Sequence, residues 1–295
     1  MFYKIINNCY LYHYFFLFNL KKKINLRVAL CTMGKEENLY IKEFINYYTK
    51  LGVDKIFIYD DNDPNREKFS DVISKSEIKY IKIYESLHNL PDSLTSCYNE
   101  NKNDFDWFIM VDMDEFLYIV KDNLKNYLLN KRFEKCDFIK INWVLAKDNN
   151  LLNYDNRSLF ERFKGPYIKT RVIKSIIRGN IENLTYSVHS PKDSPLRNVA
   201  CNNIGKINNN YRSIYTSDIN IDKAYIIHFR YKSTEEFIKR YKKGYNWVKD
   251  KKYVASYLKR KILDYFKYNQ VTKNKVEYIE RELHINLTKY NITIK

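Results

Sequence analysis

Glycine and proline are scarce in this chain of 295 residues, which contains 6 glycines and 5 prolines. Neither the Gly-x-Gly-x-x-Gly pattern of dinucleotide-binding folds nor the glycine loop of P-loop NTPases occurs, so no glycine-rich loop would hold a phosphate. Disorder is excluded as well, because 45% of the residues are hydrophobic and 16% are aromatic. The composition therefore predicts a folded globular protein with a sizeable core.

Cysteine is also sparse, and the five cysteines form no Cys-x-x-Cys pair. They are Cys9, Cys31, Cys97, Cys136 and Cys201. An odd, scattered set is typical of neither a disulfide framework nor a zinc site. Cys31 and Cys136 lie in apolar runs, so we expect buried free thiols and a reducing compartment, which favours a cytoplasmic location.

No apolar run is long enough to span a bilayer. The most apolar stretch, residues 9–20, contains His13 and falls short of the roughly 20 residues that a spanning helix needs. Three lysines follow this stretch rather than precede it, and no small-residue cleavage site comes after it, which argues against a signal peptide. We expect residues 1–25 to form an apolar and basic extension, with a peripheral contact at the inner membrane face as its functional alternative.

Negative charge is in short supply, since 35 Asp and Glu face 52 Lys and Arg and leave a net charge of +17. Such a protein favours anionic partners, which include nucleotide phosphates, acidic glycans, membranes and nucleic acids. A metal-dependent nuclease would also use carboxylates and a basic surface, and it is the alternative function. It predicts a lysine beside the acidic site and a basic groove with exposed aromatics. Residues 137–140 are only a faint match to this pattern, so nucleic acid is not the expected partner.

The chain from Leu26 onward alternates between strand-like and helix-like segments. Strands are expected at residues 27–32, 54–59, 79–84, 107–111, 136–143, 169–175, 185–189 and 223–229, and helices at residues 35–51, 66–76, 94–103 and 123–132. This alternation predicts an α/β fold with a mainly parallel sheet and helices on both faces. Ser233 then opens a series of basic helices, with Glu236 as its capping-box partner.

Three carboxylates follow the buried strand that ends at Val111. They are Asp112, Asp114 and Glu115. In an extended chain, residues two apart point the same way, so Asp112 and Asp114 would project together and Glu115 would point away as a supporting group. The carboxyl ends of parallel strands are where such sheets bind ligands. Two adjacent carboxylates there predict a site for a hard divalent cation, and a diphosphate can complete its coordination.

Other polar residues end neighbouring strands. Asp60 and Asp61 close one of them, and they either contact a ligand or belong to an ordinary turn. His228 ends the apolar run that begins at Ala224, which makes it a candidate third metal ligand. His189 is the alternative ligand, and a structural role is the other interpretation of each histidine.

Three ordered motifs within residues 27–245 resemble those of GT-A-fold glycosyltransferases, most closely glycosyltransferase family 92 and the family-2-like group. The first comprises Gly34-Lys-Glu-Glu-Asn38, Ile41-x-Glu-Phe-Ile45, Leu51-Gly-Val-Asp54 and Ile58-Tyr-Asp-Asp-Asn62. The second is Val111-Asp-Met-Asp-Glu-Phe116, which looks like the metal-binding Asp-x-Asp. The third is His228-Phe-Arg-Tyr-Lys-Ser233 with Glu236-Phe237, in which Phe229 replaces the commoner tyrosine.

The resemblance implies a GT-A fold and a transferase of the hexosyltransferase class, of the kind used in polysaccharide biosynthesis. Asp112 and Asp114, with His228, would hold Mn²⁺ or Mg²⁺ against the diphosphate of a nucleotide-sugar, a UDP-sugar first among them. The ion would stabilise the leaving nucleoside diphosphate as a Lewis acid. Residues expected to contact the donor are Glu37, Asp60, Asp61, Arg230 and Lys232. The acceptor would be a glycan, a lipid-linked saccharide or an anionic saccharide.

Inverting transfer also needs a base for the acceptor hydroxyl, and Asp193 and Glu161 are the candidates. We expect a catalytic domain at residues 26–232, with a nucleotide-sugar half at 26–120 and an acceptor half at 121–232. A helical region would follow at residues 233–295.

Overall fold

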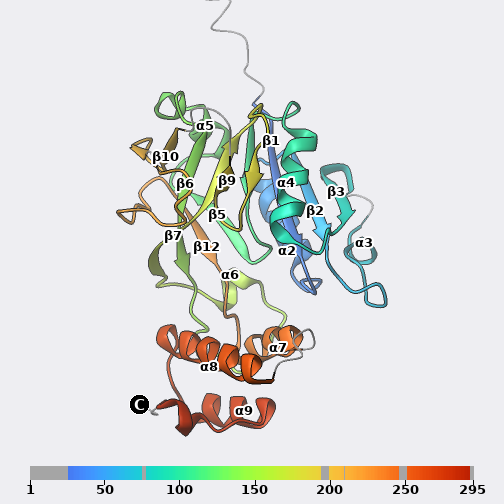
Figure 1. Cartoon of the computed structure of the whole chain (residues 1–295), viewed down its shortest axis with the longest axis vertical. Coiled ribbons are helices and arrows are strands. Elements are labelled where there is room, and N and C mark those ends of the chain that lie inside the picture. The colour runs from blue at the N-terminus through green and yellow to red at the C-terminus, as the bar shows by residue number, and fades with distance from the viewer. Residues whose placement is uncertain (1–25, 75–77, 194–198, 209, 246–250, 293–295) are drawn as a thin grey trace, which may run out of the picture.

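The computed structural model describes residues 26–74, 78–193, 199–208, 210–245 and 251–292 (Figure 1). Residues 1–25, with Cys9 and the expected extension, lie outside this part. The strands form a mostly parallel central sheet with helices against it, and three further helices follow at one end (Figure 1). The prediction of an α/β fold with a mainly parallel sheet is confirmed.

The N-terminal half of the sheet is wholly parallel. Its order is β3 (Ile81–Glu85), β2 (Lys55–Asp60), β1 (Val28–Gly34) and β4 (Trp107–Met110). Alternate residues of β1 point to opposite faces, as in any strand. Val28 and Leu30 pack on the face covered by α2 (Ile41–Leu51), and Ala29 and Cys31 pack on the face covered by α4 (Leu90–Asn101). Both faces are therefore buried, which explains the uninterrupted apolar runs.

Helix α2 is shorter than expected. Its buried face consists of Ile41, Phe44, Ile45 and Tyr48, and Gly52 ends it with a positive φ of 104°. Residues 35–40, expected to be helical, instead lead from the end of β1 into the helix. Of the helix expected at residues 66–76, the part that the structure describes, up to residue 74, contains α3 (Phe69–Val72).

The second half of the sheet mixes strand directions. β7 (Ile168–Arg178) runs antiparallel between β4 and β6 (Phe138–Leu145), and β12 (Ala224–His228) pairs with both β6 and β5 (Glu115–Ile119). The remaining elements are α5 (Leu124–Leu129), α6 (Leu159–Arg162), β8 (Thr185–Tyr186), β9 (Pro191–Asp193), β10 (Ala200–Asn202) and β11 (Ile207–Asn208), with 3-10 turns at Ile78–Tyr80, Lys131–Phe133 and Leu287–Tyr290. Strand β5 begins at Glu115, the last residue of the acidic cluster, and was not predicted.

Three helices follow the sheet, namely α7 (Thr234–Tyr245), α8 (Lys251–Tyr268) and α9 (Lys273–Leu283). They share an apolar cluster that includes Phe237, Ile262 and Ile279. The loop at residues 147–156 holds them to the sheet, because buried Asp148 accepts hydrogen bonds from Tyr265 and from Lys275, the latter with Nζ 2.6 Å from Oδ2. Within the described residues, no helix combines the length and apolar character that crossing a membrane requires.

Two disulfides contradict the expectation of free thiols. Cys31 on β1 is bonded to Cys97 on α4, and Cys136, just before β6, is bonded to Cys201 on β10. The partners are 66 and 65 residues apart, so spacing along the chain gave no sign of them. They meet because α4 packs on β1 and because β10 pairs with β6. The argument from free thiols for a reducing compartment is therefore lost.

Candidate active site

A turn, rather than an extended strand, carries the acidic cluster. β4 ends at Met110 and β5 begins at Glu115, and the Glu115 N–H donates to the Asp112 carbonyl at 3.1 Å. The Asp112 N–H in turn donates to Glu115 Oε2 at 3.0 Å. The rule for residues two apart does not hold in such a turn, so it does not set the direction of Glu115, whose side chain is fully buried.

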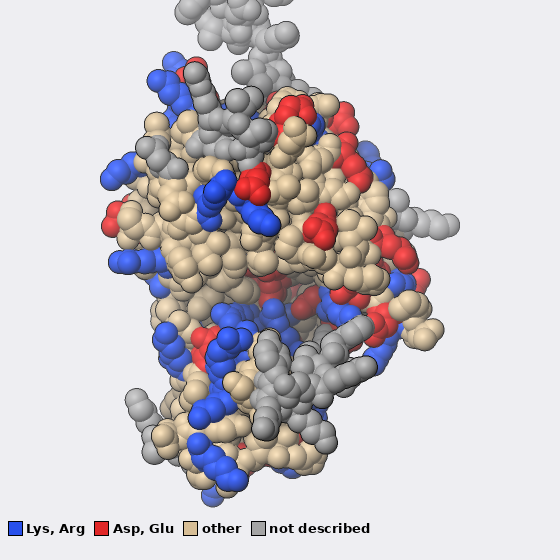
Figure 2. All heavy atoms as spheres, in the orientation of Figure 1, with Lys and Arg blue, Asp and Glu red and all other residues tan. Residues whose placement is uncertain are grey.

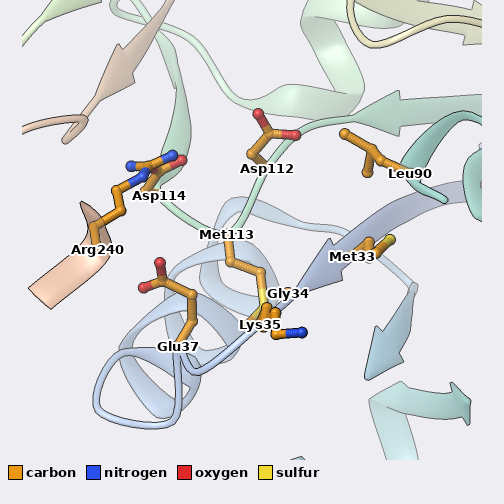
Figure 3. A pocket seen from close by; sticks show the side chains of 9 residues that line it. All are labelled: Met33, Gly34, Lys35, Glu37, Leu90, Asp112, Met113, Asp114 and Arg240. Atoms are coloured by element: carbon orange, nitrogen blue, oxygen red, sulfur yellow. The ribbon is translucent and has the colours of Figure 1, made fainter. Parts of the chain in front are cut away.

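Asp112 and Asp114 nevertheless face one cavity, which we call the acidic cleft. It encloses about 330 Å³ and lies at the carboxyl ends of β1 and β4 (Figure 3). Its lining consists of Met33, Gly34, Lys35, Glu37, Leu90, Asp112, Met113, Asp114 and Arg240. Gly34 is needed where β1 meets the turn, because a Cβ there would lie 2.0 Å from Met113 Sδ. In Figure 2, acidic side chains lie inside the hollow and basic side chains follow its lower edge.

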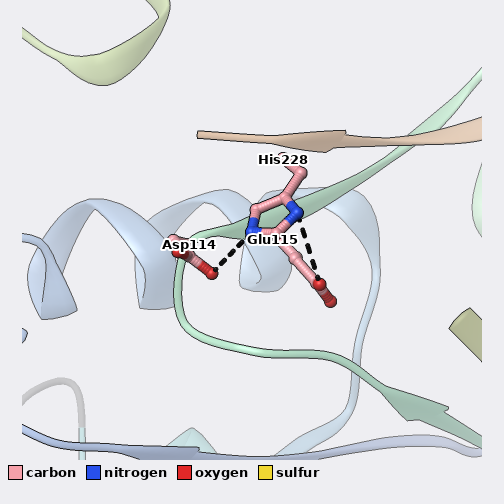
Figure 4. Close-up of side chains that lie close together, drawn as sticks. All are labelled: Asp114, Glu115 and His228. Atoms are coloured by element: carbon pink, nitrogen blue, oxygen red, sulfur yellow. Dashed lines mark ion pairs between the residues drawn. The ribbon is translucent and has the colours of Figure 1, made fainter. Parts of the chain in front are cut away.

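His228 joins two of the carboxylates beside this cleft (Figure 4). It is the last residue of β12 and stands opposite Glu115 of β5. Its Nε2 lies 3.4 Å from Asp114 Oδ1 and its Nδ1 lies 3.9 Å from Glu115 Oε1. One potential ligand atom from each of the three residues falls within 4.8 Å of the others. We call Asp114, Glu115 and His228 the buried triad.

The buried triad fits a divalent cation. Both His228 ring nitrogens and Glu115 Oε1 are buried, and none has a hydrogen-bond partner among the described residues. Buried polar atoms without a partner are costly, so a ligand that satisfies them would stabilise the site. Two carboxylates and an imidazole are a donor set that Mn²⁺ or Mg²⁺ accepts. Asp112 lies outside the triad but faces the same cleft.

Burial and charge set the protonation of the triad. Burial raises the pKa of Glu115 well above its usual range, and the negative charge of Asp112 adds to this effect. Burial opposes ionisation of Asp114 too, but the neighbouring His228 and Arg240 hold its pKa well below its usual range, and of these two the Arg240 guanidinium is the group that always carries a positive charge. Burial also lowers the pKa of His228, which favours the neutral imidazole that binds metals. A bound cation would favour the ionised form of Glu115.

Two cations beside these carboxylates were missed from the sequence. Lys174 of β7 is fully buried, and its Nζ lies 2.9 Å from Asp112 Oδ1 and 3.6 Å from Glu115 Oε2. Asp112 and Glu115 raise its pKa despite burial. Its signal in the sequence was a lysine inside an apolar strand. Arg240 of α7 places Nη1 2.7 Å from Asp114 Oδ2, although the sequence suggested only a basic helix surface.

Three of the expected donor-contacting residues lie around a second cavity, which we call the basic cleft. It encloses about 210 Å³ and shares Glu37 and Arg240 with the acidic cleft. Lys232 pairs with Glu37 at 2.7 Å, and Arg230 pairs with Asp264 at 2.8 Å. The full lining is Glu36, Glu37, Leu39, Tyr40, Arg230, Tyr231, Lys232, Glu236, Lys239 and Arg240. The two clefts therefore adjoin, with Glu37 and Arg240 between them.

Asp60 and Asp61 line neither cleft. Asp60 is buried and accepts hydrogen bonds from the backbone N–H groups of Asn62 and Phe69, at 2.9 and 2.8 Å, which holds the loop after β2. Asp61 lies 2.9 Å from His88 Nδ1 and 3.7 Å from Lys35 Nζ. The contact of Asp60 with the Asn62 N–H matches the turn chemistry that was the alternative for this pair, whereas Asp61 forms ion pairs between side chains.

Neither residue named as a base lines a cleft. Asp193 is exposed at the end of β9 and pairs with Arg212 at 3.1 Å. Glu161 forms the capping box of α6 with Ser158. The alternative ligand His189 donates its Nδ1–H to the Ile173 carbonyl at 3.1 Å and packs against the Trp143 ring. Burial and the charge of Lys174 lower the pKa of His189 to about 4.

A family model matches most of the chain. The model of the family described as "Glycosyltransferase family 92" matches residues 25–274. The glycosyltransferase family 92 protein Os08g0121900 of rice (Oryza sativa subsp. japonica) is 25% identical over 112 residues, which are 36% of this chain and 19% of the rice protein. The matched part thus spans about a fifth of that relative's length.

Similarity to solved structures is weaker. A chain from Bacillus anthracis, assigned as a glucose-1-phosphate thymidylyltransferase, has a TM-score of 0.29 at 13% identity and covers 52% of this chain and 71% of its own. HddC from Yersinia pseudotuberculosis has a TM-score of 0.28 at 10% identity, with 68% and 76% covered. Scores this low carry no argument.

Proposed function

This chain belongs to glycosyltransferase family 92, and from that premise we propose a metal-dependent transferase that uses a nucleotide-sugar, with UDP-sugars as the first candidates. It is a glycosyltransferase, so it requires a sugar donor and a glycan acceptor. We further propose that its α/β domain is of the GT-A type, with Asp112 and Asp114 serving as the Asp-x-Asp pair.

The observation that carries the proposal is the buried triad beside the acidic cleft. Asp114, Glu115 and His228 would hold Mn²⁺ or Mg²⁺, and Asp112 would face the same space from the other side of the turn. The bound ion would supply Lewis-acid stabilisation to the departing nucleoside diphosphate. Glu37 would orient the donor at the point where the two clefts adjoin.

We propose the basic cleft as the acceptor side. Its lining has four cationic residues, namely Arg230, Lys232, Lys239 and Arg240, against the three glutamates Glu36, Glu37 and Glu236, so positive charge is in slight excess. Cationic side chains of this kind favour an acceptor with carboxylate, phosphate or sulfate groups, including an anionic saccharide or a lipid-linked one. The roles of Asp193 and Glu161 as bases stay predictions. Neither residue lines either cleft, so their positions add no support.

One observation supports the nuclease alternative, and another argues against it. It required a lysine beside the acidic cluster, and Lys174 occupies that position. Lys174 is fully buried, however, so it has no direct access to a phosphodiester. Membership of the family favours the transferase.

The test is a screen of nucleotide-sugars for Mn²⁺-dependent hydrolysis, which needs no knowledge of the acceptor. We expect hydrolysis of at least one nucleotide-sugar, abolished by EDTA and restored by Mn²⁺. Asp114→Asn and His228→Gln should lower the rate by about 10- to 100-fold or more, since groups that hold a metal are worth this much. Asp122→Asn is the control, because Asp122 is exposed and lines neither cleft. Full activity in EDTA, or in both triad variants, would refute metal dependence.

A further inference from the structure

Among the residues that line the acidic cleft, Arg240 is the one that comes from the C-terminal helices. It extends from α7 and contacts Asp114 Oδ2 at 2.7 Å, and the same Nη1 donates to the Arg230 carbonyl at 3.1 Å. The side chain of Asp114 is only 4% exposed, whereas that of Arg240 is 46% exposed. Arg240 therefore covers a buried carboxylate while it lines both clefts, and Figure 3 shows it beside Asp114 in the acidic cleft.

The two partners of Asp114 compete for its charge. Oδ2 faces Arg240, and Oδ1 faces His228 within the buried triad. A divalent cation held by the triad would share the Asp114 carboxylate with Arg240 and repel the guanidinium. Besides Asp114, the Arg230 carbonyl holds the Arg240 head group through a hydrogen bond, and the charge of Glu37 acts on it as well. Arg240 would thus be released toward the acidic cleft whenever that cation is bound.

A phosphate in the acidic cleft is the partner that the released guanidinium would meet. Arginine carries five N–H donors in a planar fork that matches phosphate oxygens, and such charge-assisted bonds are strong. Lys35 is a second cation on the lining of this cleft. A diphosphate bound beside the metal ion would therefore neutralise the charge of Arg240, as Asp114 does in the free protein.

We propose that Arg240 exchanges Asp114 for a donor phosphate when the buried triad binds its cation. In the free protein Arg240 neutralises Asp114, and in the loaded protein it binds the diphosphate from the side of α7. The inference rests on the proposed function, because it names a donor-binding residue of the same site. It also gives the C-terminal helices a part in donor binding.

Loss of Arg240 should then change two affinities in opposite directions. Without nucleotide, Arg240→Gln removes a competitor for Asp114, so the affinity for Mn²⁺ should rise by about two- to fivefold, the worth of a partly exposed ion pair. With Mn²⁺ saturating, the same change removes a phosphate contact, so the affinity for UDP should fall by about 10- to 100-fold. A purely structural role of Arg240 would weaken both.

The experiment titrates Mn²⁺ alone, followed by electron paramagnetic resonance of the free ion, and then UDP at saturating Mn²⁺ by calorimetry. The proteins are the wild type, Arg240→Gln, Arg240→Lys and Lys242→Gln, each checked for native circular dichroism. Arg240→Lys keeps the charge without the fork, so we expect near wild-type Mn²⁺ binding and weaker UDP binding. Lys242 is the matched control, because it lies on the same helix, pairs with Glu282 at 2.9 Å and lines neither cleft.

Parallel changes of the two affinities in Arg240→Gln, or no change in either, would overturn the exchange and leave the proposed function intact. A wild-type protein that binds neither Mn²⁺ nor UDP would overturn both. Opposite changes in Arg240→Gln, with Lys242→Gln like the wild type, would support the exchange.

Discussion

Replacing Lys174 by methionine tests the electrostatics of the site most directly. Lys174 is fully buried, and its ammonium faces Asp112 at 2.9 Å, Glu115 at 3.6 Å and the Val188 carbonyl at 2.8 Å. Removal of one member of a buried ion pair leaves an uncompensated charge and costs about 3–5 kcal/mol. Lys174→Met should therefore lower the free energy of unfolding by about that much at pH 8. Adding Glu115→Gln should recover part of the loss, because a neutral amide replaces the buried charge.

The cost should also depend on pH. The pKa of Glu115 is raised above its ordinary value of 4.5, and loss of Lys174 raises it further. A carboxyl group with a raised pKa in the fold contributes stability that is present below its unfolded pKa and is lost as the pH rises through its folded pKa. The destabilisation should thus be smaller at pH 5 than at pH 8. Urea unfolding followed by circular dichroism and fluorescence measures it, and equal losses at the two pH values, or losses below 1 kcal/mol, would refute the reasoning.

Three further results are expected. The pKa of His189 falls from 6.5 to about 4 in the fold. Neutral His189 should therefore contribute at most about 3 kcal/mol of stability, which is lost as the pH falls from 6.5 to 4. A His189→Gln variant that showed the same loss would contradict this assignment. Lys275→Met should destabilise by about 3–5 kcal/mol because it strands buried Asp148, and Asp148→Asn in the same chain should relieve part of it, as a double-mutant cycle by urea unfolding would reveal. Peptide mapping without reductant should find Cys136 joined to Cys201, and replacing both by alanine should cost about 4 kcal/mol for a loop of this length; free thiols in the native protein would disprove the bond and return support to a reducing compartment.

The sequence by itself determined the frame of the fold. Apolar runs at strand length alternate with the helical spacing of residues such as Ile41, Phe44, Ile45 and Tyr48, and both patterns are local consequences of backbone geometry. The position of Asp112 and Asp114 at the end of a buried strand followed from the same patterns. The position of His228 at the end of β12 followed from them as well, because the apolar run from Ala224 predicts a strand whose last residue lies at the edge of the sheet.

Only the tertiary structure decided which of these residues meet. Glu115 turned toward His228 because β5 starts at Glu115 and pairs with β12, a contact between segments more than 100 residues apart in the sequence. Lys174 reaches Asp112 across 62 positions and Arg240 reaches Asp114 across 126. The disulfide partners are likewise joined by the packing of α4 on β1 and of β10 beside β6. Local periodicity fixes the face on which a side chain lies, whereas its partners depend on strand order and helix docking, which distant parts of the chain decide together.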